Sequence, residues 1–115
     1  MILTAVRQEE SAILRALPLP REERVGGFLF HIGIVNRIRV ILGRSGMGPA
    51  RAESCCTEAL IHYCPSRVIA AGFAGSLNEK VQVGDLVFAS TVRAAHDYNT
   101  VLNQAAQYGA KIAVR

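Results

Sequence analysis

The stretch that most constrains the fold comprises residues 66–90, with the sequence SRVIAAGFAGSLNEKVQVGDLVFAS. Its first part, residues 68–71, is a run of small apolar side chains that does not alternate with polar ones. Such a run predicts a strand buried on both faces, as in the sheets of α/β proteins. A loop of glycine, alanine and serine around Phe73, residues 72–76, follows this strand directly.

The glycine-containing loop has two interpretations. Ligands of open α/β sheets bind just past the carboxyl ends of the strands, and a loop without bulky side chains lets a ligand approach its backbone. Alternatively, the glycines serve a tight turn that requires a positive φ, and the glycines alone do not decide between these readings. A dinucleotide-binding loop is disfavoured, because the spacing is not G-x-G-x-x-G and the next predicted element is a strand.

The remaining elements follow from periodicity and from turn residues. Residues 2–6 predict a strand that enters the core, and residues 7–17 predict a helix with two glutamates in its first turn. A polar loop is expected over residues 21–24. Residues 27–34 and 38–43 predict two strands joined by a short hairpin, in which Asn36 can adopt the left-handed conformation. Further along, we expect a helix over 50–63, a strand over 86–92, a helix over 100–108 and the beginning of a strand over 111–115.

Helices placed between buried strands indicate an α/β sheet with parallel crossovers. The length of 115 residues allows one small domain, which we assign to residues 1–115. The chain ends on the apolar opening of a strand, and proteins normally protect such a sheet edge. We therefore expect the domain to be incomplete at its C-terminus, or a partner to cover the edge.

Composition narrows the class of partner. The net charge is +4, but the basic residues are scattered and the chain has no tryptophan, so we expect a solvated basic face and no nucleic-acid partner. The three cysteines lack metal-ligand spacing, and the three histidines form no recognisable catalytic triad with a serine or cysteine. We expect no metal, no cofactor and no membrane partner. With no signal peptide or apolar span in view, the expected location is the cytoplasm.

Three motifs in order carry a family resemblance: RSGMGP at 44–49 before a small-residue helix, AGFAGSL at 71–77, and VGDLV at 83–87. Together they resemble the loops of the purine nucleoside phosphorylase and nucleosidase superfamily. The resemblance covers nearly all of this chain but only the first half of the family's domain. It implies the N-terminal half of a phosphorylase/hydrolase-like three-layer αβα sheet, in a protein that commonly forms homo-oligomers.

The resemblance also implies a reaction, cleavage of the N-ribosidic bond of a purine nucleoside such as a 5′-thioadenosine. The hydrolases of the family use a water held by carboxylates, and the phosphorylases use phosphate. The family's second half carries the Met-Glu motif that clamps the ribose hydroxyls and the group that protonates or holds the purine N7. Neither can be placed in these 115 residues, so we expect this chain by itself to be inactive.

Carried over by position, Glu9 matches the glutamate that holds the nucleophilic water. The register leaves Gln8 as a competing match, and Glu9 can alternatively be an ordinary carboxylate at a helix start. Met47 matches the apolar residue that lines the ribose or 5′ region, or it packs in the core. The loop that passes along the base and ribose is matched by Phe73, Ala74 and Gly75. Asp85 of the VGDLV motif is expected to be structural.

Departures from the family favour a hydrolase. Phe73 stands where the family often has serine or threonine, and Ala70 replaces an arginine that usually precedes it. An N-terminal Gly-Asp-Pro phosphate motif is also missing. Loss of these donors weakens a phosphate site. We therefore expect a nucleosidase. A nucleoside phosphorylase of the same superfamily, and a non-catalytic half-domain that binds a nucleoside or a partner, remain as alternatives.

Overall fold

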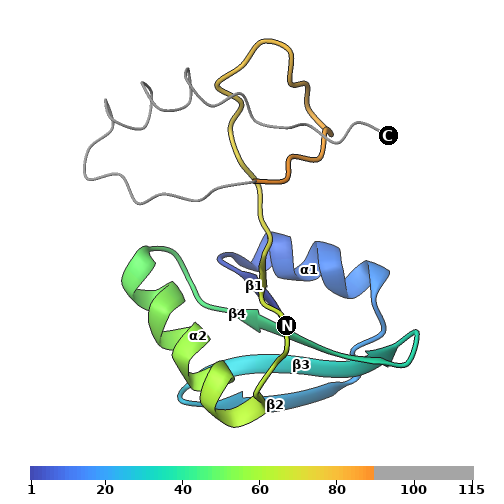
Figure 1. Cartoon of the computed structure of the whole chain (residues 1–115), viewed down its shortest axis with the longest axis vertical. Helices are drawn as coiled ribbons and strands as arrows, with labels where there is room; N and C mark the ends of the chain where they lie inside the picture. The colour runs from blue at the N-terminus through green and yellow to red at the C-terminus, as the bar shows by residue number, and fades with distance from the viewer. Residues whose placement is uncertain (90–115) are drawn as a thin grey trace. The chain divides into compact units, whose positions relative to one another are not determined.

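The computed structural model describes residues 1–89, which fall into two units. The first unit, Met1–Phe73, holds every helix and strand described below, and the second begins at Ala74. Figure 1 shows the elements of the first unit in chain order. They are β1 (Ile2–Thr4), α1 (Arg7–Ala16), β2 (Arg21–Val25), β3 (Phe28–Val35), β4 (Ile38–Arg44), α2 (Pro49–Tyr63) and β5 (Ile69–Ala70).

The five strands form one mixed sheet in the order β2-β3-β4-β1-β5. Strand β1 pairs in parallel with both β4 and β5, which confirms the parallel crossovers predicted from the sequence. Strands β2, β3 and β4 are antiparallel neighbours. The carboxyl ends of β1, β4 and β5 therefore lie at one edge of the sheet. From this edge β1 leads to α1, β4 leads to α2, and β5 leads to residues 72–76, here called the Gly72 loop.

Two hairpins build the antiparallel half of the sheet. The predicted hairpin is confirmed: Asn36 and Arg37 form its turn with φ of 48° and 67°. The polar loop expected over residues 21–24 is wrong, because these residues belong to β2. Gly26 and Gly27, with φ of 57° and 83°, make the two-residue turn that connects β2 to β3. Two successive left-handed residues match the twist of paired strands, which explains both connections.

Strand β2 was not predicted because its charged residues do not show the alternation of apolar and polar side chains that indicates a strand. Its position in the sheet explains why the charges are tolerated. Strand β2 is the first in the sheet order, and edge strands commonly carry charges. Glu23 also binds α2, because the Tyr63 hydroxyl donates to Glu23 Oε2 at 3.2 Å. Burial and the Glu23 carboxylate raise the pKa of Tyr63 to about 12, so its hydroxyl stays protonated and remains a donor.

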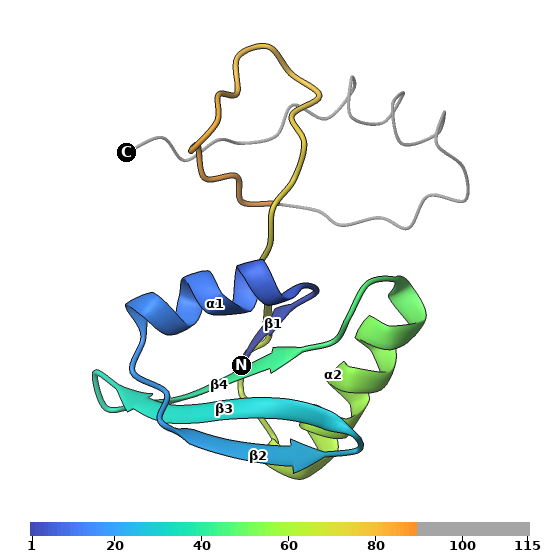
Figure 2. The ribbon, with the colours of Figure 1, turned by 180° about the vertical axis from the view of Figure 1, so that it is seen from behind.

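The two helices cover opposite faces of the sheet (Figures 1 and 2). Successive side chains of a strand point to opposite faces. On β3, Phe30 and Ile32 join the core formed with α2, whereas His31 between them meets α1 through Glu10. The three layers expected from the family resemblance are thus present in the first unit. The core facing α2 consists of Phe30, Ile32, Ile41, Cys55, Ala59 and Tyr63.

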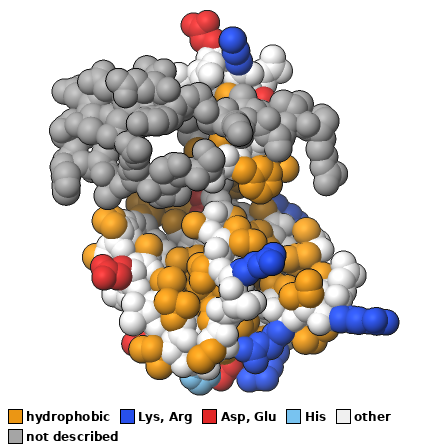
Figure 3. Space-filling view, viewed as in Figure 1, with side chains coloured by type: hydrophobic (Ala, Val, Ile, Leu, Met, Phe, Trp, Pro, Cys, Tyr) orange, Lys and Arg blue, Asp and Glu red, His pale blue; other side chains and the backbone are white. Residues whose placement is uncertain are grey.

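The prediction that the strand at residues 68–71 is buried on both faces is wrong. Strand β5 is two residues long, and Val68 and Ile69 are 43% and 56% exposed. Within residues 1–89 it has a sheet neighbour on one side only, which is β1. Other large apolar residues of the first unit are also exposed, among them Ile38 and Ile61. Figure 3 shows hydrophobic side chains on the surface of this unit. An apolar run indicates a tendency to be buried, and within residues 1–89 only part of this surface is buried.

The second unit is described over residues 74–89, and these residues form turns and irregular segments. Ser76, Asn78 and Lys80 form one set of short-range hydrogen bonds, in which the Lys80 N–H donates to Asn78 Oδ1 at 2.9 Å. Asp85 Oδ2 accepts from the Gln82 N–H at 2.9 Å, a turn-forming bond of the structural kind expected for this residue. Of the strand predicted over 86–92, residues 86–89 contain only a single bridge residue, Val87. An extended segment is a β-strand only where its backbone hydrogen-bonds to an adjacent strand.

The predicted helix over 100–108 and the strand beginning at 111 lie outside the described residues. Neither helix of the described chain has the length and apolar character that a membrane span requires.

Candidate active site

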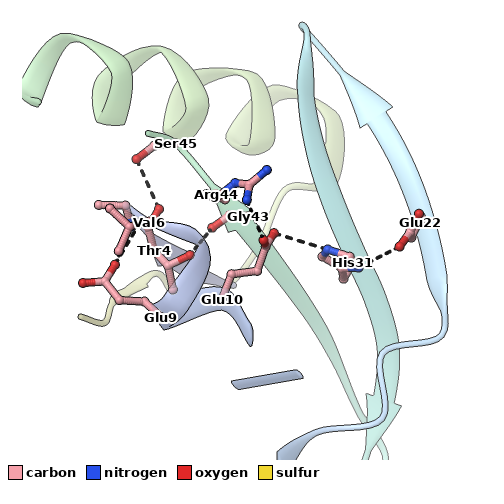
Figure 4. A network of polar contacts seen from close by, with 10 residues as sticks. Thr4, Val6, Glu9, Glu10, Glu22, His31, Gly43, Arg44 and Ser45 are labelled. Atoms are coloured by element: carbon pink, nitrogen blue, oxygen red, sulfur yellow. Dashed lines mark hydrogen bonds and ion pairs between the residues drawn. The ribbon is translucent and has the colours of Figure 1, made fainter. Parts of the chain in front are cut away.

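Glu9 ties together two loops at the carboxyl edge of the parallel strands. It lies in the first turn of α1, and its Oε2 accepts from the backbone N–H groups of Ala5 at 2.9 Å and Val6 at 3.1 Å. Its Oε1 accepts from the Phe73 N–H at 2.9 Å, across 64 residues of sequence. Figure 4 shows Glu9 turned back toward Val6. One carboxylate therefore connects the loop after β1 with the loop after β5.

The Gly72 loop is shaped to admit this carboxylate. A Cβ at Gly72 would lie 2.6 Å from Glu9 Oε1, closer than real Cβ atoms come to their neighbours, and a tight 3.0 Å from the carboxyl carbon. A glycine here lets the carboxylate reach the Phe73 N–H. The glycine thus serves a close approach to the backbone, but the group that approaches in this structure is Glu9 and not a ligand. Neither Gly72 nor Gly75 has the positive φ that the tight-turn reading requires.

The backbone N–H groups keep Glu9 ionised. Partial burial raises the pKa of this carboxyl, but the hydrogen bonds from Phe73, Ala5 and Val6 outweigh burial and hold the pKa below its ordinary value. Hydrogen bonds to the charged form have this sign because they are lost on protonation. A carboxylate has about four acceptor positions, and the three N–H groups leave about one for a water molecule or a ligand.

This pKa predicts a dependence of stability on pH. A carboxyl whose folded pKa is depressed stabilises the fold fully above its unfolded pKa, about 4.5, and the contribution is lost as pH falls through the folded pKa. We expect Glu9→Gln to unfold more easily than the parent at pH 7, because an amide NH₂ then faces N–H donors. The difference in unfolding free energy, measured with urea, should shrink steadily below pH 4.5. A difference that stays constant down to pH 3 would contradict this account.

The ends of β1 and β4 are joined by short hydrogen bonds. The Ser45 N–H donates to Thr4 O at 2.9 Å, and the Thr4 hydroxyl donates to Gly43 O at 3.2 Å. Thr4 and Ser45 are buried, so these bonds fix the start of the loop that continues through Gly48 into α2. Arg51 on α2 also binds this loop, because its Nε donates to Ser45 O at 3.1 Å. These hydrogen bonds hold the start of the loop beside β1.

The structure brings some of the predicted site residues together and leaves others apart. Glu9 and the backbone of Phe73 are in direct contact, whereas the competing Gln8 is exposed. Met47 is 75% exposed in the loop after β4, so it does not pack in the core of the first unit, and Phe73 is 73% exposed. Ala74 and Gly75 are exposed residues of the second unit.

A polar cluster beside this edge was not predicted from the sequence. Glu10, next to Glu9, points to the other side of α1's first turn and lies between Arg44 and His31 (Figure 4). Arg44 Nη1 is 3.1 Å from Glu10 Oε2, and His31 Nε2 is 3.3 Å from Glu10 Oε1. The second ring nitrogen of His31 is 3.5 Å from Glu22 Oε1. Side chains alternate between the two faces of a strand, so His31 and Phe30 in residues 28–35 point to opposite faces of the sheet. This alternation was the signal that could have indicated the cluster.

The cluster lines a pocket of about 290 Å³ between α1 and the sheet, together with Arg7, Ser11, Leu14 and Leu29. Glu10 Oε1 is buried from solvent and receives no well-directed hydrogen bond, so a molecule in the pocket cannot reach this atom. In residues 1–89, histidine, cysteine and acidic side chains do not gather in threes around any point where a metal ion could sit.

The fold and this edge place the chain among three-layer α/β proteins whose loops gather where parallel strands end. The family model of the phosphorylase superfamily matches residues 1–111. The chain belongs to this superfamily, as the three sequence motifs indicated.

Two curated relatives are both described as 5′-methylthioadenosine/S-adenosylhomocysteine nucleosidase. The protein of Maridesulfovibrio salexigens is 32% identical over 92 residues, which is 80% of this chain and 40% of that protein. The Bacillus cereus protein is 38% identical over 87 residues, covering 75% of this chain and 38% of that protein. The chain thus spans about two fifths of the length of the curated relatives it matches.

Solved structures agree with the sequence relatives. A variant of the Helicobacter pylori nucleosidase with 5′-methylthioadenosine in its active site matches with a TM-score of 0.68 and 28% identity, over 73% of this chain and 37% of that chain. A futalosine hydrolase from the same organism matches with a TM-score of 0.67 and 28% identity, over 73% of this chain and 36% of that one. The phosphorylase/hydrolase-like α/β fold expected for this chain is therefore confirmed.

Proposed function

We propose that this chain is the N-terminal part of a nucleosidase that cleaves the N-ribosidic bond of a purine nucleoside of the 5′-thioadenosine type. The curated relatives are named as nucleosidases for such compounds, and a related structure holds 5′-methylthioadenosine. The observation that carries the proposal for this chain is the Glu9 carboxylate, held by three backbone N–H groups where β1 and β5 end.

Glu9 holds the attacking water in this proposal. The carboxylate is ionised and has about one acceptor position left, so it can accept a hydrogen bond from a water and take its proton as the water attacks the ribose carbon. Its rigid anchoring favours this use, because the water is then fixed relative to the loops. Protonation of the departing purine falls to residues that lie beyond the part of the fold this chain spans.

The substrate lies against the two loops in this proposal. Met47 extends from the loop after β4 and contacts the ribose or its 5′ substituent through an apolar surface, which suits a thioether. The base and ribose pass along Phe73, Ala74 and Gly75. The exposed Phe73 ring offers an apolar face where a phosphorylase would offer a hydroxyl, and this difference favours water over phosphate as the nucleophile.

Release of free base tests the proposal. Adenine formed from 5′-methylthioadenosine is measured by chromatography for the 115-residue chain and for the complete product of its gene, whose length is established by intact mass. We expect release by the complete product and none by residues 1–115 alone. Equal rates with and without phosphate identify a hydrolase, and a rate that requires phosphate identifies the phosphorylase alternative. No release from any purine nucleoside by the complete product would overturn the proposal.

A non-catalytic half-domain is the second candidate. The observation that favours it is the coverage of about two fifths of the relatives, together with exposed apolar side chains on β5. An intact mass equal to that of this chain, with nucleoside binding and no base release, would favour this candidate.

A further inference from the structure

Adjacent glutamates on α1 have different partners. Glu9 is bound to backbone N–H groups of two loops, whereas Glu10 faces the strands and meets side chains of β3 and β4. The side chain of Glu10 is 7% exposed, and Arg44 beside it is 35% exposed. The pair is therefore a mostly buried link between the first turn of α1 and the last residue of β4.

The environment of Glu10 makes its position well defined. Burying a carboxylate without partners is unfavourable by several kcal/mol or more, so the side chain is confined to the place where Arg44 and His31 meet it. Its Oε2 faces Arg44 Nη1, and its Oε1 is closed off from solvent beside His31. His31 is itself held from the far side by Glu22 on β2. Rotation of α1 about its axis would break these contacts.

The pair also stands between the two segments that shape the candidate site. Glu10 follows Glu9 directly, and Arg44 directly precedes Ser45, the residue bonded to Thr4. A change in the setting of α1 on β4 moves Glu9 relative to the Phe73 N–H, which belongs to a different strand end. A displacement of about 1 Å at a catalytic group can lower a rate by about 10²-fold.

We propose that Glu10 and Arg44 form a positioning pair that sets the rotation of α1 on β4 and thereby holds the Glu9 carboxylate against the Phe73 N–H. The geometric part of this proposal concerns the first unit alone. Its catalytic consequence, a lower kcat with little change in KM, rests on the proposed function.

The test measures the pKa of Glu9 by carboxyl-carbon NMR in the full chain, because this quantity separates positioning from simple charge effects. In Glu10→Gln a negative charge next to Glu9 is removed, which by Coulomb's law alone would lower the pKa of Glu9. Loss of positioning weakens the N–H hydrogen bonds and raises that pKa toward 4.5. We expect the upward shift, with faster hydrogen exchange of the Phe73 amide.

Two further variants keep the test decisive. Glu10→Asp retains the charge but shortens the side chain by one methylene, so it should also raise the pKa of Glu9, and it answers the question if Glu10→Gln does not fold. Glu22→Gln touches the same His31 from the exposed side and should leave Glu9 as in the parent. An unchanged or lowered Glu9 pKa in both Glu10 variants, with normal Phe73 exchange, would overturn the proposal. The readout needs no turnover, so it stands apart from the base-release assay.

Discussion

Replacement of Glu9 by Gln should lower kcat for base release by about 10²–10⁴-fold in the complete gene product, the range associated with loss of a general base. Glutamine has nearly the same shape, and its carbonyl oxygen can still accept from one of the N–H groups that hold Glu9. It cannot take a proton from water. The effect should therefore be large in kcat and small in KM, because the proposed function assigns the ground-state contacts of the substrate to other residues.

Gln8→Ala is the matched control for this prediction. Gln8 precedes Glu9 on the same helix and was the competing match for the family glutamate, but it is exposed. Its replacement should leave kcat within about twofold, as is typical of surface changes. The opposite pattern, with loss of activity in Gln8→Ala and a normal rate in Glu9→Gln, would transfer the proposed role to Gln8. Circular dichroism of both variants shows whether either change disturbs the fold.

Much of the fold could be predicted because its signals are local. The helix over 49–63 begins at Pro49 and ends before Pro65, and the Asn36 turn requires a left-handed residue, so their positions depend on single residues. Strand β2 was missed for the opposite reason. Its charged residues are compatible with a strand only because β2 lies at the sheet edge and Glu23 has partners on α2. Neither condition can be read from five residues.

The candidate site was predictable only in part. Glu9 and the Gly72 loop were selected from the motifs, and the structure adds the reason for the glycine, since the carboxylate occupies the space of a side chain. The cluster of Glu10, His31 and Arg44 was missed because its members are 13 to 34 positions apart and meet only through strand register. A single histidine in an apolar run gives no indication of which face it occupies until its neighbours across the sheet are known.

Replacement of Phe30 by Ala should have the largest effect on stability, a loss of about 3–5 kcal/mol in the free energy of unfolding. Phe30 is fully buried at the centre of the core that faces α2. Its ring packs edge-to-face on Tyr63 with 5.3 Å between centroids, and Gly43 opposite has no side chain that could fill the space left behind. Small domains are stable by only about 5–15 kcal/mol, so the variant should be largely unfolded at low urea concentration.

Phe73→Ala makes the same chemical change at an exposed position and is the control. Phe73 is 73% exposed, so the free energy of unfolding should change by no more than about 0.5 kcal/mol. Urea unfolding of the two variants, followed by circular dichroism, makes the comparison. A loss of less than about 1 kcal/mol in Phe30→Ala would mean that the packing between β3 and α2 does not hold the first unit together. If only Phe30→Ala lowers the free energy of unfolding, Phe30 stabilises the first unit and Phe73 does not. Phe73 would then be free to serve the proposed substrate site.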